Sequence, residues 1–366
     1  MFSPVFKITN KTLSNLIQVE IAGKVVRLAQ LQPDWESRLK LETVVRRIYS
    51  LVKFSANELK LDDVAKIVKD EPGRDDKAHQ VALRAGVVGK EKDIQQALNL
   101  LNVNRLIEQL AFLAGKFQQG EPGEKELSQI NTLLSERLVL PNETGRFRDK
   151  EIEGSTSASP LAVEVPFQME DLFAWFKSVN KIEVHPINKA GIMFFELLRI
   201  CPYSENNLLT AISFFRLTLA SEGYGLKKLW SIEEEVLKNA DNFYQAVSSV
   251  ERNSGELTNW LEYLSRCLSE AAEKTQTKVM NLVGETQIFK SEGGRVISLT
   301  ERQIAIMEEM NLKNEMTIKE IRNVLPMVSD DTILRDLKDL IDKKLIRKKG
   351  KTKGALYVMG KARSYR

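Results

Sequence analysis

Residues 200–209 read Ile200-Cys201-Pro202-Tyr203-Ser204-Glu205-Asn206-Asn207-Leu208-Leu209. This stretch follows residues 189–200 and precedes residues 206–222, and both of these segments carry apolar side chains at helical spacing. The proline and the polar run between the two segments are typical of a loop. The pattern therefore predicts two apolar helices joined by a short polar turn.

Most of the chain has the same helical pattern. Leu, Ile, Glu, Lys and Ala dominate the composition, and the alternation of apolar and polar residues that is typical of strands is rare. We therefore expect a mostly α protein, with irregular segments at residues 71–76, 120–123 and 141–166. One exception is residues 21–31, where we expect a short strand pair around a Gly-Lys turn.

Composition and sequence motifs exclude several classes of protein. The apolar content of 43% and charged content of 28% are ordinary for a soluble chain. The longest apolar stretch, residues 190–200, is interrupted by Glu196 and Arg199 and is too short to span a bilayer. The N-terminus lacks a secretion signal pattern. Cys201 and Cys267, with only two histidines, make neither a disulfide framework nor a zinc site. These features predict a cytoplasmic protein without membrane association.

Charge is distributed unevenly along the chain. Residues 300–366 hold 16 Lys and Arg against 10 Asp and Glu, whereas the rest of the chain is slightly acidic. Residues 343–366 hold ten Lys and Arg and no acid. A basic end on a near-neutral body indicates a polyanionic partner, and a solvated basic tail is the alternative.

The loop at residues 200–209 resembles the signature of the Fic (Fido) family, H-P-F-x-[D/E]-G-N-G-R. The matching positions are Pro202, Tyr203, Glu205 and Asn207. The histidine, the two glycines and the arginine are replaced by Cys201, Asn206, Leu208 and Leu209.

The resemblance extends over residues 39–273. Residues 145–148, Gly-Arg-Phe-Arg, resemble the family's G-x-F-R element. Residues 243–247 and 257–264 resemble the two helices that follow the motif in family members with a C-terminal winged helix. The resemblance therefore implies a Fic-like helical core preceded by an N-terminal helical segment.

Active Fic proteins transfer AMP from ATP to a protein hydroxyl, and the replaced residues bear on that chemistry. Cys201 stands where the family has its proton-accepting histidine, and a free thiol is a poor base at neutral pH. Leu208 suits the phosphate-binding turn badly because that turn favours glycine. Leu209 and Ile212, at the positions of two arginines, cannot pair with phosphate. We therefore expect no intact catalytic site and no cofactor, with ATP and Mg²⁺ relevant only if an altered transferase activity persists.

Two further assignments follow from the resemblance. Glu205 matches the acid that holds Mg²⁺ in active relatives, which makes it a weak candidate metal ligand, and the favoured alternative is that it caps the following helix. Residues 53–61 align with the family's inhibitory helix, S-x-x-I-E-G-N, and this alignment puts Ser55 at the position of the inhibitory glutamate. An ordinary exposed helix end has the same sequence.

The C-terminal residues follow the order of a winged helix, after a Gly293-Gly294 linker. Thr300 and Ser329 are expected to cap the first and third helices. The expected elements are helices at 301–310, 317–324 and 330–343, strands at 345–348 and 355–359, and a basic turn at 349–354.

Residues 329–340 resemble the recognition helices of bacterial winged-helix regulators, with the pattern S-x-x-T-x-x-R-D-L-x-x-L. In such folds the third helix enters the major groove. Thr332 and Arg335 are then the candidates for base contacts, with Lys338 beside them. The candidates for backbone contacts are Ser329, Arg347, Lys348, Lys349, Lys351 and Lys353. We also expect Asp331, Asp336 and Asp339 to face outward, which would put negative charge on the same face.

These observations predict three parts: an N-terminal segment at 1–90, a Fic-like core at 91–290 and a winged-helix DNA-binding domain at 291–366. The favoured function is a DNA-binding transcriptional regulator whose inactive core mediates homodimerisation or senses a ligand. The first alternative is a transferase that uses ATP to modify protein hydroxyls. The second is a protein-interaction module, such as an antitoxin-like partner, without a role at DNA.

Overall fold

The computed structural model describes residues 2–31, 33–117, 121–152, 159–288, 299–313, 315–325, 328–350 and 355–359. The chain divides into two compact units, one of Met1–Gln30 with Glu36–Met280 and one of Leu31–Trp35 with Asn281–Arg366. Each unit has a buried apolar core. Gly293, Gly294, Lys351 and Lys353 lie outside the described residues.

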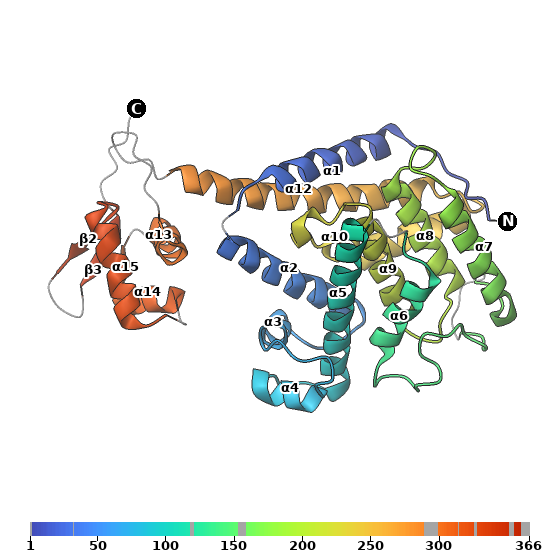
Figure 1. Cartoon of the computed structure of the whole chain (residues 1–366), viewed down its shortest axis with the longest axis horizontal. Helices are drawn as coiled ribbons and strands as arrows, with labels where there is room; N and C mark the ends of the chain where they lie inside the picture. The colour runs from blue at the N-terminus through green and yellow to red at the C-terminus, as the bar shows by residue number, and fades with distance from the viewer. Residues whose placement is uncertain are drawn as a thin grey trace. The chain divides into compact units, whose positions relative to one another are not determined.

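Helices dominate the structure, which confirms the prediction of a mostly α protein (Figure 1). The helices that begin before residue 260 are α1 (Asn10–Leu28), α2 (Pro33–Phe54), α3 (Leu61–Lys69), α4 (Ala78–Ala85), α5 (Glu91–Phe117), α6 (Glu124–Ser135), η1 (Ala162–Glu164), α7 (Val165–Ser178), α8 (Pro186–Ile200), α9 (Asn207–Ser221), η2 (Leu226–Lys228), α10 (Ile232–Val236), α11 (Ala240–Arg252) and α12 (Thr258–Ile288).

The apolar helices α8 and α9 form the centre of the larger unit. Nearly every residue of each is buried, because α9 packs against α5, α6 and α8 at once. Gly191 of α8 allows a close approach, since a Cβ there would lie 2.8 Å from Leu264 of α12. Trp260 of α12 donates to the Gly191 carbonyl at 2.8 Å and stacks edge-on against Phe194. The predicted pair of apolar helices is thus confirmed as the core around which the other helices pack.

The strand pair predicted at residues 21–31 is wrong. Helix α1 starts after Thr9, whose side chain caps it, and continues to Leu28. Val19, Ala22 and Val26 are buried at helical spacing, so apolar burial outweighs the cost of Gly23 inside a helix. The helix lies along α12 (Figure 1), where Asn15 donates to Ser265 Oγ at 3.1 Å.

The smaller unit combines helices with a short sheet. Its elements are α13 (Glu301–Lys313), β1 (Glu315–Thr317), α14 (Ile318–Val324), α15 (Asp330–Asp342), β2 (Ile346–Lys349) and β3 (Leu356–Met359). The strands pair antiparallel in the order β1-β3-β2, with Tyr357 opposite both Met316 and Lys348. The predicted helices and strands lie within three residues of those observed, and β1, only three residues long, was not predicted.

The helices carry no membrane span within the part of the chain that the structure describes, because none is both long and apolar enough.

Candidate functional site

The 201–207 loop, which joins α8 to α9, begins and ends on left-handed residues. Cys201 closes α8 with φ 47° and ψ 64°, and Asn206 opens α9 with φ 61° and ψ 24°. Side chains other than glycine adopt this conformation rarely, and asparagine does so more readily than most. These two residues turn the chain so that α8 and α9 become neighbours.

The loop's main chain is held by hydrogen bonds at four carbonyls. Arg148 donates twice, from Nε to the Cys201 carbonyl at 2.9 Å and from its backbone N–H to the Pro202 carbonyl at 2.9 Å. Asn207 bridges Tyr203, because Nδ2 donates to its carbonyl at 2.7 Å and Oδ1 accepts from its N–H at 2.9 Å. Asn131 of α6 donates to the Glu205 carbonyl at 3.1 Å. The loop is therefore fixed from both sides.

The Gly-Arg-Phe-Arg element supplies half of this support. Gly145 has φ +66°, and a Cβ there would lie 2.1 Å from Thr132 Oγ1, so glycine is required. Its N–H donates to Asn131 Oδ1 at 2.9 Å. Arg148 is buried, and its Nη2 also donates to the Pro160 carbonyl at 2.6 Å. The sequence identified this element through the resemblance, but not its contact with the loop.

The side chains of the loop have few polar contacts. Cys201 Sγ donates to the Leu198 carbonyl at 3.0 Å, and burial raises the pKa of its thiol although the Arg148 cation opposes this shift. Tyr203 is fully buried, which raises its pKa, and its hydroxyl forms no hydrogen bond with the part of the chain that the structure describes. The Glu205 side chain is exposed and forms no hydrogen bond or ion pair with other described residues. Leu209 and Ile212 are buried in the core of the larger unit.

Glu205 does not belong to a metal-binding cluster. No group of three or more His, Cys, Asp or Glu side chains that could hold a metal ion occurs among the described residues. Nor does its side chain cap α9, because the N-terminal position is taken by Asn206 and no side chain makes a capping hydrogen bond there.

Ser55 is exposed and directly follows the last residue of α2. Its hydroxyl donates to the Leu51 carbonyl of that helix at 3.0 Å. It forms no hydrogen bond with the 201–207 loop within the described ranges. Its assignment to an inhibitory position remains a prediction.

The predicted nucleic-acid contacts gather on α15 and β2 of the smaller unit. Arg335 and Lys338 are exposed on one face of α15, and β2 exposes its three basic residues, Arg347, Lys348 and Lys349. Ser329 caps α15, and its hydroxyl lies 2.9 Å from that of Thr332, which is half-buried. Lys348 Nζ lies 5.9 Å from the centre of the Tyr357 ring.

The prediction that Asp336 faces outward is wrong. Asp336 is 5% exposed and accepts from Arg302 of α13 at 2.5 Å. Asp339 is half-buried and accepts from Gln303 at 2.6 Å, and Asp330 forms an ion pair with Arg322. These contacts bury the carboxylate of Asp336 only. Asp330 and Asp331 remain exposed on α15, and the charges of Asp330 and Asp339 are paired with Arg322 and Lys343.

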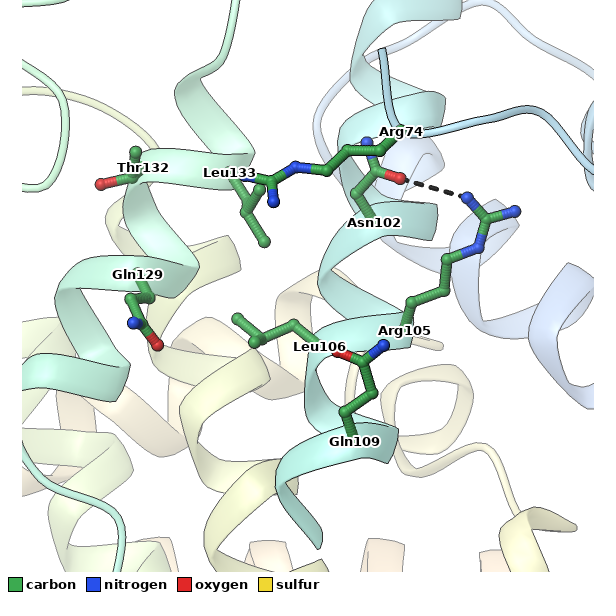
Figure 2. Close-up of a pocket in the computed structure, with 8 residues that line it drawn as sticks. All are labelled: Arg74, Asn102, Arg105, Leu106, Gln109, Gln129, Thr132 and Leu133. Atoms are coloured by element: carbon green, nitrogen blue, oxygen red, sulfur yellow. Dashed lines mark hydrogen bonds between the residues drawn. The ribbon is translucent and has the colours of Figure 1, made fainter. Parts of the chain in front are cut away.

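Five cavities of about 320 to 530 Å³ open on the larger unit, and none of these five is lined by a residue of the 201–207 loop. One of about 370 Å³ lies between α5 and α6. Figure 2 shows Arg74 reaching across it from a loop towards Leu133, while Arg105 donates to Asn102 on α5. No predicted site residue lines this cavity.

Residues 123–219 match the model of the Fic/DOC family. The chain contains a Fic/DOC family domain. The matched range runs from the start of α6 to the end of α9, so it includes both the Gly-Arg-Phe-Arg element and the 201–207 loop. The resemblance found in the sequence is thereby confirmed at the level of the domain.

Solved structures of Fic proteins share the fold. A Fic family protein from Desulfovibrio desulfuricans G20 matches with a TM-score of 0.65 and 17% identity, over 99% of this chain and 100% of that one. A Fic domain containing signalling protein from Bacteroides thetaiotaomicron VPI-5482 matches with a TM-score of 0.55 and 15% identity, over 78% and 100% of the two chains. Fic-1 from C. elegans matches with a TM-score of 0.54 and 16% identity, over 76% and 73%. At these identities the likeness establishes the fold alone.

Proposed function

We propose that this chain is a Fic-fold protein without AMP-transfer activity, which acts as a DNA-binding regulator through its smaller unit. The observation that carries this proposal is the basic surface of α15 and β2, which exposes Arg335, Lys338 and the three basic residues of β2 while Asp336 is turned inward. The larger unit would provide a scaffold for a homodimer.

The topology of the smaller unit supports a winged helix. The unit has three helices and a three-stranded antiparallel sheet with the strand order β1-β3-β2. Helix α15 is the third of these helices, and in winged-helix proteins the third helix is the recognition helix. Arg335 has the reach and the fork geometry for guanine. Thr332 is half-buried beside the Ser329 cap, so we assign most of the base recognition to Arg335.

The 201–207 loop does not fit ATP with Mg²⁺. Burial raises the pKa of the Cys201 thiol, which makes it a weaker proton acceptor than a histidine. Leu209 and Ile212 present buried apolar side chains where phosphate would need cations. Within the described ranges, Glu205 has no neighbouring His, Cys, Asp or Glu side chains that would form a Mg²⁺ site with it. We therefore expect this loop to catalyse no AMP transfer.

A mobility-shift assay tests the DNA proposal. Arg335→Ala is expected to weaken binding to a selected site by about 1–3 kcal/mol and to relax the sequence preference. Lys349→Ala is expected to weaken binding equally for all sequences and to reduce the slope of log affinity against log salt by about one. Lys92→Ala, an exposed lysine on α5, is the charge-matched control. Equal binding by the wild type and all three variants would remove the proposal.

Labelled ATP tests the transferase alternative. The protein is incubated with labelled ATP and Mg²⁺, alone and with cell extract, and no covalent label is expected on any protein. Label that appears with the wild type and disappears with Glu205→Ala would establish the alternative and overturn the first half of the proposal.

Sedimentation of the purified chain tests the homodimer. A recognition helix gains useful specificity when two copies read two half-sites, so we expect a dimer at micromolar concentration. A monomer at that concentration, on and off DNA, would contradict this part.

A further inference from the structure

A cavity of about 320 Å³ lies at the opposite end of α9 from the 201–207 loop. Helices α1, α2, α5 and α9 line it together with the segment 223–232. Its charged lining is mostly cationic, since five cationic side chains and one carboxylate, that of Glu108, line it. The cations are Arg27, Arg47, Arg216, Lys227 and Lys228.

Two of these cations are buried at the back of the cavity. The Arg47 and Arg216 side chains are 5% and 9% exposed, and both pair with one carboxylate, that of Glu233, at 3.2 and 3.0 Å. Both also donate to Asn104 Oδ1, at 2.7 Å each. Two buried guanidinium groups therefore share one buried anion and one neutral acceptor.

These pairings leave one N–H group of Arg216 able to donate a further hydrogen bond. Its Nε forms an ion pair with Glu233 without the angle of a hydrogen bond, so a buried N–H stays unsatisfied. Burial, and then the charge of Arg47, lower the pKa of Arg216 to about 9. Buried charge without full compensation is costly, and an oxyanion in the cavity would offset that cost.

The front wall of the cavity is strained. Leu226, Lys227 and Lys228 all have positive φ, at 39°, 53° and 66°. Residues other than glycine adopt this conformation at a cost in free energy, and strain of this kind concentrates at ligand-binding sites. The turn brings Lys227 and Lys228 to the rim, where Lys228 donates to Glu108 at 2.7 Å.

The remaining walls are apolar. Ile107 and Ala111 of α5 and Ala220 of α9 face the cavity, and Phe112, 64% exposed, stands at the edge. A ligand that contacted both the cationic and the apolar walls would carry a negative charge at one end and an apolar ring at the other.

We propose that this cavity binds a small organic anion, in which an aromatic body lies along Phe112 and Ile107 and a carboxylate, sulfonate or phosphate meets Arg216, Arg47 and Arg27. The lining residues belong to the larger unit and include none of the 201–207 loop, so the proposal stands whether or not the proposed function holds.

The test uses the full chain and a fluorescent aromatic sulfonate, 8-anilinonaphthalene-1-sulfonate, with the neutral dye N-phenyl-1-naphthylamine for comparison. Titration is expected to show saturable binding of one sulfonate dye per chain, at least tenfold tighter than the neutral dye. Inorganic phosphate is expected to compete.

Arg27→Gln removes a rim cation that makes no hydrogen bond or ion pair with another described residue, so it leaves the fold undisturbed. It is expected to weaken dye binding about tenfold. Lys24→Gln, at an exposed lysine three residues away on α1, is expected to bind as the wild type does. The proposal is overturned if the two variants bind alike, if the neutral dye binds as tightly as the sulfonate, or if binding does not saturate.

Discussion

At the scale of single residues, Arg148 and Asn207 explain how the 201–207 loop keeps its shape. Each uses its side chain to bind backbone groups of the loop, so the hydrogen bonds that hold the turn come from the protein itself. The resemblance identified both residues; Asn207 binds Tyr203 four residues before it, whereas Arg148 reaches the loop from 53 residues away. Contacts such as the one from Asn131 to Glu205 require the folded chain.

Arg148→Met is expected to lower the free energy of unfolding by about 3–5 kcal/mol, because it leaves the half-buried Cys201 and the buried Pro160 carbonyls without this donor, at about 1–3 kcal/mol each, and removes its other contacts. Urea denaturation measures the change. Arg146→Met, an exposed neighbour, is expected to change the free energy by less than about 0.5 kcal/mol. Equal effects of the two substitutions would show that the hydrogen bonds of Arg148 to the loop do not stabilise the fold.

Cys201 is expected to react slowly with iodoacetamide at neutral pH. Burial raises the pKa of its thiol, so the thiolate fraction in the folded protein stays below that of a free cysteine until the pH exceeds the usual thiol range. Cys267, with a pKa raised to about 11 by burial, is expected to react later still as the pH rises. Mass spectrometry of the alkylated peptides measures both rates, and protein unfolded in urea is the control. Rapid labelling of native Cys201 at pH 7 would contradict the assignment.

At the scale of elements, the spacing of apolar residues predicted those helices whose position depends on residues close together in the sequence. Ser329 and the spacing of Ile333, Leu337 and Leu340 placed α15 to within a residue. The same pattern misplaced Asp336, because the partner that allows its burial, Arg302, is 34 residues away. Strand β1 was missed because three residues carry too little alternation to be recognised. The Arg47–Glu233 pair, 186 residues apart, left no signal in the sequence at all.

The backbone strain at η2 can be tested with a glycine substitution that relieves it. Lys227→Gly is expected to stabilise the fold by about 1 kcal/mol relative to Lys227→Ala, since glycine adopts positive φ without strain and both variants lose the hydrogen bond from Lys227 to the Ala29 carbonyl. Both variants are expected to bind the aromatic sulfonate more weakly, because both remove the same cation. Thermal melts and dye titrations give the two values, and equal stability of the two variants would mean that the turn stores no strain.

At the scale of the whole molecule, the chain has two units with separate cores, so it is expected to unfold in two calorimetric transitions. Ile130 and Ile306 are fully buried isoleucines in the larger and smaller unit, and Ile→Val at either removes one methylene at about 0.5–1.5 kcal/mol.

The two substitutions should shift different transitions. The same loss of free energy moves the melting temperature of a small unit further, by about 4–8 °C per kcal/mol for 60–100 residues against about 2–4 °C for 150–250. Ile306→Val is therefore expected to lower the smaller transition alone and by the larger amount, and Ile130→Val to lower only the other. Cognate DNA should raise the first transition and the aromatic sulfonate the second, because a ligand stabilises the unit that binds it. A single transition that both substitutions shift equally would mean that the units fold as one, and a ligand bound to either would then be felt by the whole chain.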